Sequence, residues 1–359
     1  MKFYLQDIYI NGLACAVPSH VIENTDFYDQ LGKETVDKFI AMTGVQQSHR
    51  TPEEQTASDL CFVAAKELLE KRRIDVSSIG AIVFISQTPD YRLPATACVL
   101  HKRLGLSKDC MAFDVNLGCS GYVYGLNIVG SLMRTSPMEN ALLLFGNTRS
   151  KTTSPDDQSS VMLFGDAASA TILSRKTGEN ISGDLKSDGT GFKTIIVPAG
   201  AYRNRNASHE RTLWGDGNIR SDYDGYMNGT DVFTFSISEV PRQIKTFMSK
   251  SGTSPEDYDA LILHQANLLI LKQISKKLKI PMEKIPVSLD RYGNTSGASV
   301  PLMICDAYGE RDSGKMRLLT AGFGVGLSWG VADITIDAGK ILPVIVTDDY
   351  FTEGAVSHD

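Results

Sequence analysis

The stretch FDVNLGCSGYVYGLNIVGSLM, residues 113–133, decides the fold class of this protein. It opens as a short apolar strand, passes a cysteine set between glycines, and continues as a helix-periodic apolar run from Tyr122 to Met133. Glycines permit the tight turn that leads from a buried strand directly into a helix. The stretch therefore predicts a strand-turn-helix unit with Cys119 at its turn.

Runs that resemble buried strands recur on both sides of this unit. They are short, continuous and apolar, as strands covered on both faces must be, and lie at 81–85, 141–145, 260–263 and 317–320. Helical patterns lie at 56–71 and 268–278. Because strands and helices alternate, the fold class is α/β.

The order of these signals occurs twice. The first half contains, in this order, SSIGAIVFISQT, the cysteine unit, ALLLFGN and FGDAASATILS. The second half contains, in the corresponding order, PEDYDALILHQAN, VSLDRYGNTSGASVPLMICDAY, RLLTAGFG and GLSWGVADITI. We therefore expect a duplicated fold, with halves at 1–175 and 176–337 and an extension at 338–359 to which the sequence assigns no role.

The duplication predicts that three polar side chains meet. In related halves Cys119 and Asn294 occupy equivalent strand-to-helix junctions, and His264 follows the strand at 260–263. Side chains at the carboxyl ends of such strands face a shared crevice, which is the usual ligand site of α/β sheets.

Composition excludes several classes of function. The 359 residues carry 36 Lys and Arg against 42 Asp and Glu, without a basic run interleaved with aromatics, which argues against a nucleic-acid partner. No stretch reaches the roughly 18 apolar residues of a membrane span, so we expect a cytoplasmic protein without a membrane partner. Six scattered cysteines lack CxxC spacing, which argues against both a metal site and a disulfide framework.

Cys119 is the candidate nucleophile. The partial positive charge at the start of the following helix favours a thiolate over a thiol. A cysteine is more commonly a small buried residue, but the flanking glycines and the two partner motifs favour the reactive interpretation here.

His264 and Asn294 are candidate hydrogen-bond donors to one oxygen atom. A neutral imidazole Nε2–H and an amide N–H aimed at the same oxygen form an oxyanion hole suited to an enolate beside a thioester. A Cys-His-Asn set also occurs in cysteine hydrolases, where His deprotonates the thiol and Asn orients His. The residue types alone leave both chemistries open.

The glycine-rich segment 322–326 and two polar segments complete the candidate site. A dinucleotide-binding loop requires a following helix, whereas LSWGVADITI resembles a strand, so we interpret the glycines as backbone brought close to a bound carbonyl. Segments 150–160 and 199–225 are predicted to be loops, the second a candidate cover for a pocket.

Together these motifs resemble the ketoacyl-acyl carrier protein synthase III family of thiolase-fold condensing enzymes. The resemblance rests on DVNLGCSGYVYGL, FGDAASA, LHQAN, LDRYGNTSGASVP and GFGVGLSWG, and it covers residues 5–336. It implies a homodimer of thiolase-like, duplicated five-layer α/β/α/β/α protomers. The implied activity is an acyltransferase reaction without metal, flavin or nicotinamide cofactor.

The resemblance also implies roles for individual residues. Cys119 takes the acyl group from an acyl thioester, and the backbone N–H groups of Cys119 and Val325 hold the oxyanion. His264 and Asn294 stabilise the enolate formed when a malonyl thioester, on acyl carrier protein or coenzyme A, loses CO2. The implied acyl pocket consists of Leu93, Phe164, Met227, Phe233 and Phe323. The implied basic residues that dock the carrier are Lys276 and Lys277.

Some recognition residues of the family are replaced. Lys38 and Met42 stand where bacterial fatty-acid members place the tryptophan and arginine that enclose the adenine of coenzyme A, and Leu269 replaces a carrier-docking arginine. Leu93, which by resemblance reaches into the partner protomer's acyl channel, replaces a larger aromatic residue and suggests room for a chain longer than acetyl. Three alternatives stay open: acyl transfer to an oxygen or nitrogen acceptor without decarboxylation, a non-catalytic partner subunit, and a cysteine hydrolase.

Overall fold

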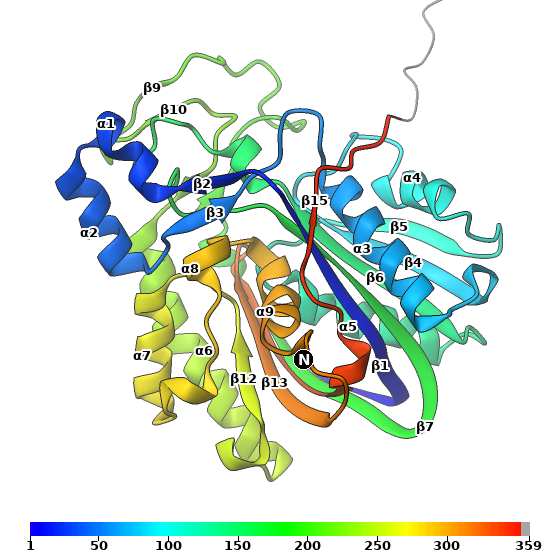
Figure 1. Ribbon diagram of the computed structural model, residues 1–359. Coiled ribbons are helices and arrows are strands. Elements are labelled where there is room, and N and C mark those ends of the chain that lie inside the picture. Colours follow the sequence, from blue (N-terminus) through cyan, green and yellow to red (C-terminus); the bar gives the residue numbers. More distant parts are fainter. Residues whose placement is uncertain (353–359) are drawn as a thin grey trace, which may run out of the picture.

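A computed structural model of the chain describes residues 1–352 (Figure 1). The strands are β1 (Lys2–Pro18), β2 (Val21–Glu23), β3 (Gln47–His49), β4 (Ile79–Ile85), β5 (Met111–Val115), β6 (Asn140–Asn147), β7 (Ala167–Ser187), β8 (Ile195–Ile196), β9 (Thr212–Leu213), β10 (Ile219–Arg220), β11 (Tyr226–Met227), β12 (Ala260–Leu263), β13 (Lys315–Gly324), β14 (Ser328–Asp337) and β15 (Ile345–Thr347). The α-helices are α1 (Tyr28–Leu31), α2 (Lys33–Thr43), α3 (Ala57–Arg72), α4 (Thr96–Arg103), α5 (Gly121–Arg134), α6 (Gly229–Ser251), α7 (Leu268–Leu278), α8 (Leu289–Tyr292) and α9 (Ser299–Tyr308).

Local sequence signals set the ends of the helices. Thr56 precedes α3, and its backbone N–H donates to Asp59 Oδ2 at 2.7 Å, so the helix opens on a capping box. Asn267 precedes α7, and its Oδ1 accepts a hydrogen bond from the backbone N–H of Ile270 at 2.8 Å. The helices predicted at 56–71 and 268–278 are therefore confirmed, the second with both bounds unchanged.

The strands form one large mixed sheet whose pairing pattern occurs twice. β4 and β6 are parallel, and β6, β7 and β1 follow with antiparallel pairings. In the second half β12 and β13 are parallel, and β14 and the last part of β7 follow with antiparallel pairings. The long strand β7 thus joins the two halves, and the predicted boundary at residues 175 and 176 falls inside it.

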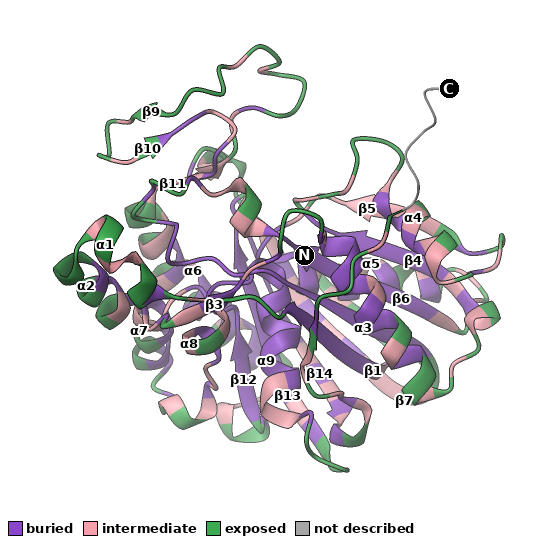
Figure 2. Cartoon of the chain, turned by 45° about the horizontal axis from the view of Figure 1, so that its top comes forward, coloured by how far each residue is buried: buried purple, intermediate pink, exposed green. Residues whose placement is uncertain are grey.

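Helices cover and separate the two halves of this sheet (Figure 1). α3 and α4 lie on the outer face of the first half, and α6 and α7 lie on the outer face of the second. Between the halves, α5 contacts β6 and β13, and α9 contacts β1 and β12, so the two helices form a central layer. The strands and the central helices are buried, while the loop that carries β9 and β10 is largely exposed (Figure 2). No helix within residues 1–352 is long and apolar enough to cross a membrane.

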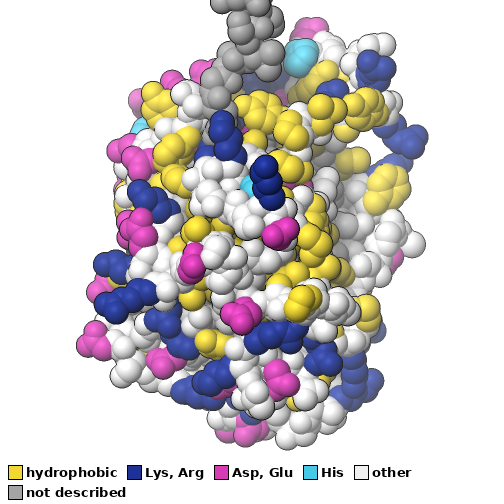
Figure 3. All heavy atoms as spheres, turned by 90° about the vertical axis from the view of Figure 1, so that its right-hand side faces the viewer, with side chains coloured by type: hydrophobic (Ala, Val, Ile, Leu, Met, Phe, Trp, Pro, Cys, Tyr) yellow, Lys and Arg dark blue, Asp and Glu magenta, His cyan; other side chains and the backbone are white. Residues whose placement is uncertain are grey.

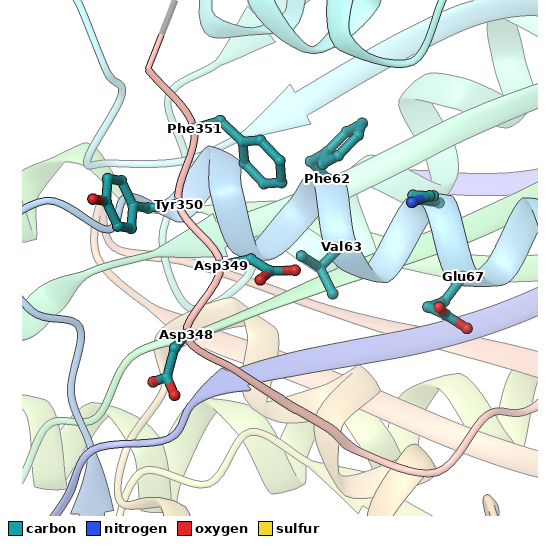
Figure 4. A pocket seen from close by; sticks show the side chains of 8 residues that line it. Phe62, Val63, Glu67, Asp348, Asp349, Tyr350 and Phe351 are labelled. Carbon is teal, nitrogen blue, oxygen red and sulfur yellow. The ribbon is translucent and has the colours of Figure 1, made fainter.

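The predicted extension at 338–359, to which the sequence assigns no role, adds a strand to the first half within its described part. β15 pairs in parallel with β1 through Ala16–Pro18. Phe351 then packs edge-on against Phe62 of α3 with ring centroids 4.7 Å apart, and its backbone N–H donates to Asp59 Oδ1 at 3.2 Å (Figure 4). The extension is therefore anchored to α3, as far as the described residues reach.

Replacing Phe351 with Ala is expected to lower the free energy of unfolding by about 1–2 kcal/mol, since it removes an aromatic pair and the cation–π contact of Arg103 at 5.2 Å. Tyr350→Ala is the matched control, because Tyr350 is 53% exposed and its loss should change stability by less than about 0.5 kcal/mol. Urea denaturation measures both. Equal effects of the two substitutions would contradict the anchoring role.

Candidate active site

Cys119 lies in the turn between β5 and α5, two residues before the helix begins. Its side chain is buried, and its Sγ lies 3.7 Å from Ser296 Oγ. The glycine-rich end of β13 packs directly against it: a Cβ atom placed on Gly324 would lie 2.8 Å from Cys119 Cβ and 3.0 Å from Sγ. Only glycine permits this approach, so the backbone of the 322–326 segment lies directly against Cys119, and its predicted approach to a bound carbonyl stays a prediction.

His264 directly follows β12 and is almost completely buried. Its Nδ1 lies 2.7 Å from Ser299 Oγ, and that oxygen accepts a hydrogen bond from the backbone N–H of Gln265 at 3.2 Å. The Ser299 hydroxyl hydrogen is then available to Nδ1, which favours the tautomer that carries its proton on Nε2. Nε2 is therefore the ring nitrogen of His264 that remains to donate to a ligand in the cavity.

Asn294 does not lie at the strand-to-helix junction that the repeat predicted. It follows the short helix α8 and Gly293, and a single β-bridge joins it to Phe164. Its backbone N–H donates to Leu163 O at 2.9 Å, and its Oδ1 accepts from the N–H of Ser296 at 3.0 Å. Because Oδ1 is occupied, the amide presents Nδ2 as its donor, with only a long contact of 3.4 Å to Ala266 O.

The local electrostatics favour a reactive thiolate at Cys119. Burial alone raises the pKa of this thiol, but the charge and hydrogen bonding of His264, the hydrogen bond of Ser296 and the charge of Arg149 outweigh it and lower the pKa to about 7. By contrast, burial raises the pKa of Cys15 and Cys61 well above the usual value. Cys119 is thus distinct from these structural cysteines.

Two backbone N–H groups beside Cys119 lack acceptors. Within residues 1–352, no hydrogen bond engages the amide N–H of Cys119 or of Val325. Most buried backbone donors are paired, so these two N–H groups are available to an oxygen atom of a ligand.

A cavity of about 630 Å³ joins these groups. Cys119, His264 and Asn294 all line it, as do Val325 and four of the predicted pocket residues, namely Phe164, Met227, Phe233 and Phe323. Residues 199–202 of the predicted cover line it as well. Leu93 does not; it is 77% exposed on the surface.

The residues predicted to meet the carrier lie outside this cavity. Lys276 and Lys277 are exposed in the last turn of α7. Lys38 and Met42 are exposed on α2, where Lys38 pairs with Glu34 at 2.7 Å. The structure leaves all four accessible. Carrier docking by Lys276 and Lys277 stays a prediction, and Lys38 and Met42, which replace the adenine-binding pair of the family, carry no predicted role.

Sequence reasoning missed three polar residues of the site. Ser296 stands within the quoted GNTSGA motif and holds a left-handed backbone with φ of 57°, the kind of strained conformation that collects at functional sites. Asn147 Nδ2 donates to Ser296 Oγ at 3.0 Å. Arg149 lines the cavity. Asn147 is the last residue of β6 and Arg149 comes two positions later, so the rule that strand ends face the crevice was a signal for both.

No group of three or more His, Cys, Asp or Glu residues able to hold a metal ion is found in the part of the chain that the structure describes. The polar groups of the cavity are instead one thiol, one imidazole, amides, hydroxyls and arginine. These groups can form a covalent thioester and donate hydrogen bonds to carbonyl oxygens.

Comparisons with known proteins agree on one family. Residues 113–189 match the family model for 3-oxoacyl-[acyl-carrier-protein] synthase III, and residues 248–336 match the model for its C-terminal part. The beta-ketoacyl-[acyl-carrier-protein] synthase III of Clostridium perfringens is 35% identical over 330 residues, covering 90% of this chain and 98% of the relative. That of Caldanaerobacter subterraneus is 35% identical over 325 residues, covering 89% and 95%.

Solved structures give the same result. A 3-oxoacyl-(acyl-carrier protein) synthase from Burkholderia xenovorans superimposes with a TM-score of 0.92 at 36% identity, covering 97% of this chain and 99% of that one. A synthase III from Pseudomonas aeruginosa gives a TM-score of 0.78 at 29% identity, covering 95% and 100%. The expected thiolase-like α/β fold is thereby confirmed.

The rate of Cys119 alkylation by iodoacetamide is expected to rise with pH around a midpoint near 7, because only the thiolate reacts. In His264→Ala the midpoint should move up by about one pH unit or more, since burial still raises the pKa while its main counterweight is gone. Peptide mass spectrometry measures modification at Cys119. His101→Ala serves as the control histidine, and a midpoint unchanged in His264→Ala would contradict the assignment.

Proposed function

The chain belongs to the 3-oxoacyl-[acyl-carrier-protein] synthase III family of thiolase-fold condensing enzymes, and from this premise we propose how its own residues perform the reaction. The protein is an acyltransferase that condenses an acyl group with a malonyl thioester. One observation carries the residue assignment: Cys119, with a pKa lowered to about 7, shares one cavity with His264 and Asn294.

In the first half-reaction the Cys119 thiolate attacks the carbonyl carbon of an acyl thioester. The oxyanion that forms accepts hydrogen bonds from the backbone N–H groups of Cys119 and Val325. This role is supported by the absence of any other acceptor for these two donors within residues 1–352. The bond between the carbonyl carbon and the donor sulfur then breaks. The donor sulfur leaves as a thiolate, which takes up a proton from water, and the acyl group remains on Sγ.

In the second half-reaction a malonyl thioester loses its terminal carboxylate as CO2. The electron pair of the broken carbon–carbon bond forms an enolate, whose oxygen accepts hydrogen bonds from His264 Nε2 and Asn294 Nδ2. The support for this role is that Ser299 holds the opposite ring nitrogen of His264 and that Ser296 occupies the oxygen of the Asn294 amide. The enolate carbon attacks the acyl-Cys119 carbonyl, the carbon–sulfur bond breaks, and a 3-oxoacyl thioester forms while Cys119 is regenerated.

The substrates enter as thioesters of coenzyme A or of acyl carrier protein, and no cofactor takes part in the proposed chemistry. The relatives from Clostridium perfringens and Caldanaerobacter subterraneus are named for acyl carrier protein. Lys276 and Lys277, exposed side by side on α7, are proposed to meet its acidic surface. The cytoplasm is the compartment in which such substrates meet the enzyme.

We propose a homodimer because β5 is an edge strand in which every residue except Asp114 is apolar. β5 pairs with β4 and ends the sheet, and Met111 on it is 43% exposed. Tyr91 and Leu93 are 50% and 77% exposed. Hydrophobic side chains gather among charged ones on this side of the molecule (Figure 3). An unpaired, apolar strand edge is stabilised by pairing with another copy, which would also bring Leu93 toward the partner's cavity.

The catalytic assignment predicts a division between the half-reactions. After incubation with acyl-coenzyme A, intact-protein mass spectrometry should show an acyl adduct on the wild type and none on Cys119→Ala. Asn294→Ala should still be acylated but should release CO2 from malonyl-acyl carrier protein at least about a hundredfold more slowly, the scale of one lost oxyanion donor. An adduct on Cys119→Ala, or discharge of the acyl group to alcohols or amines without CO2, would refute it.

The dimer is tested by sedimentation velocity. The wild type should sediment with twice the protomer mass of 39.2 kDa, and Met111→Lys should shift it toward the monomer because it places a charge on the edge. Tyr4→Lys, at a hydrophobic position on β1 that is 59% exposed, is the control and should leave the mass unchanged. A monomeric wild type would contradict the proposal.

A further inference from the structure

Arg149 brings a fixed positive charge to the cavity that contains Cys119. It directly follows Thr148 at the end of β6, opens a short 3-10 helix, and lines the cavity. Its Nη1 donates to Thr152 Oγ1 at 2.8 Å, and its guanidinium carbon lies 5.0 Å from the centre of the Phe164 ring. Phe164 belongs to the same cavity wall. The guanidinium is therefore held at the wall instead of extending into solvent.

The packing around Arg149 is specific to its position. A Cβ atom on Gly225 would lie 2.0 Å from Arg149 Nη2, so the backbone at 225 runs directly against the guanidinium. The N–H of Gly225 donates to Thr152 O at 2.8 Å, which fixes this backbone to the residue that binds Nη1. The side chain is thus preorganised between the segment 149–152 and the end of the covering loop, and preorganised donors lose little entropy on binding.

No carboxylate within residues 1–352 forms an ion pair with Arg149. Nor is any Asp or Glu of this described part among the residues that line the cavity. The nearby Asp157 is already committed, because its Oδ2 accepts from Arg220 Nε at 2.5 Å and its Oδ1 accepts from the N–H of Ser159. A partly buried guanidinium without a counter-ion is unfavourable, so an anionic group of a ligand would be its natural partner.

We propose that Arg149 binds an anionic group at the far end of the acyl chain carried by Cys119, so that the enzyme selects acyl thioesters whose chain ends in a carboxylate. This inference rests on the proposed function, since it takes Cys119 as the acyl carrier. The chemical class of the starter is then the monothioester of a dicarboxylic acid, which a guanidinium binds through paired N–H donors.

Two other roles for Arg149 fit the site less well. An ion pair to the malonyl carboxylate would stabilise the reactant more than the transition state, in which that negative charge leaves the carboxylate, and would slow decarboxylation. A role confined to the Cys119 thiolate is a poor match because the influence of Arg149 on the pKa of Cys119 is smaller than those of His264 and Ser296.

The test compares coenzyme A thioesters of dicarboxylic acids with those of monocarboxylic acids of equal chain length. The readout is the ratio of the two kcat/KM values for acylation of Cys119, measured by intact-protein mass spectrometry. Using a ratio cancels differences in folding and thiol reactivity between variants. The wild type should favour the best dicarboxylic donor by about tenfold or more, the scale of one charge-assisted hydrogen bond.

The variants then locate the preference. In Arg149→Gln the ratio should fall to about one or below, and Arg149→Lys should retain part of it because the charge remains. Arg92→Gln is the matched control: Arg92 also lines the cavity but is exposed and donates to Gly200 O at 2.6 Å, and its loss should leave the ratio unchanged. A ratio near one in the wild type, or a ratio that follows Arg92 and not Arg149, would overturn the proposal.

A binding measurement separates this proposal from the chemistry. Cys119→Ala cannot be acylated, so calorimetric affinities of the intact thioesters report on Arg149 even if no donor acylates the wild type. Tighter binding of the dicarboxylic thioester that disappears in Cys119→Ala/Arg149→Gln supports the proposal; equal binding rejects it.

Failure of every donor to acylate wild-type Cys119 would refute the proposed function separately. An Arg149 effect restricted to malonyl decarboxylation would assign the residue to the extender and overturn the inference.

Discussion

The close approach of the end of β13 to Cys119 is the constraint on which the rest of the site depends. Gly324 leaves no room for a side chain beside Sγ, so the backbone of the second half of the fold reaches Cys119 of the first. The same approach brings Val325 N–H to the cavity. Because both halves present the ends of their strands to one crevice, residues separated by more than a hundred positions meet without a long loop.

Hydrogen bonds from the surrounding chain fix the orientation of each reacting group. The N–H of Gln87 donates to Asn147 Oδ1 at 2.8 Å, and Asn147 Nδ2 donates to Ser296 Oγ, which lies beside Cys119 Sγ. Ser299 bonds Nδ1 of His264, which leaves Nε2 as the ring nitrogen that can donate elsewhere. The N–H of Ser296 bonds Oδ1 of Asn294, which leaves Nδ2 as the donor of that amide. The donors of the site are therefore already oriented, as the proposed stabilisation of developing negative charge requires.

Local patterns in the sequence predicted the parts of this arrangement that depend on neighbouring residues. The helix at 268–278 has the right bounds because Asn267 caps it, and the turn at Cys119 was predicted because glycines flank it. The family resemblance supplied the roles of His264 and Asn294. The bond from Ser299 to His264 spans 35 positions and has no local signal, and β15 pairs with a strand more than 300 residues away. Such contacts follow from tertiary packing alone, as does the position of Asn294 after a helix instead of a strand.

The most direct test of this account is the stoichiometry of a single turnover. Preformed acyl-Cys119 enzyme, freed of excess donor, is mixed with malonyl-acyl carrier protein labelled in its terminal carboxylate, and released CO2 and remaining acyl-enzyme are followed together. The account predicts one CO2 for each acyl group that leaves Cys119 and appears as a 3-oxoacyl product. Loss of the acyl group without CO2, or CO2 release at an unchanged acyl-enzyme level, would contradict it.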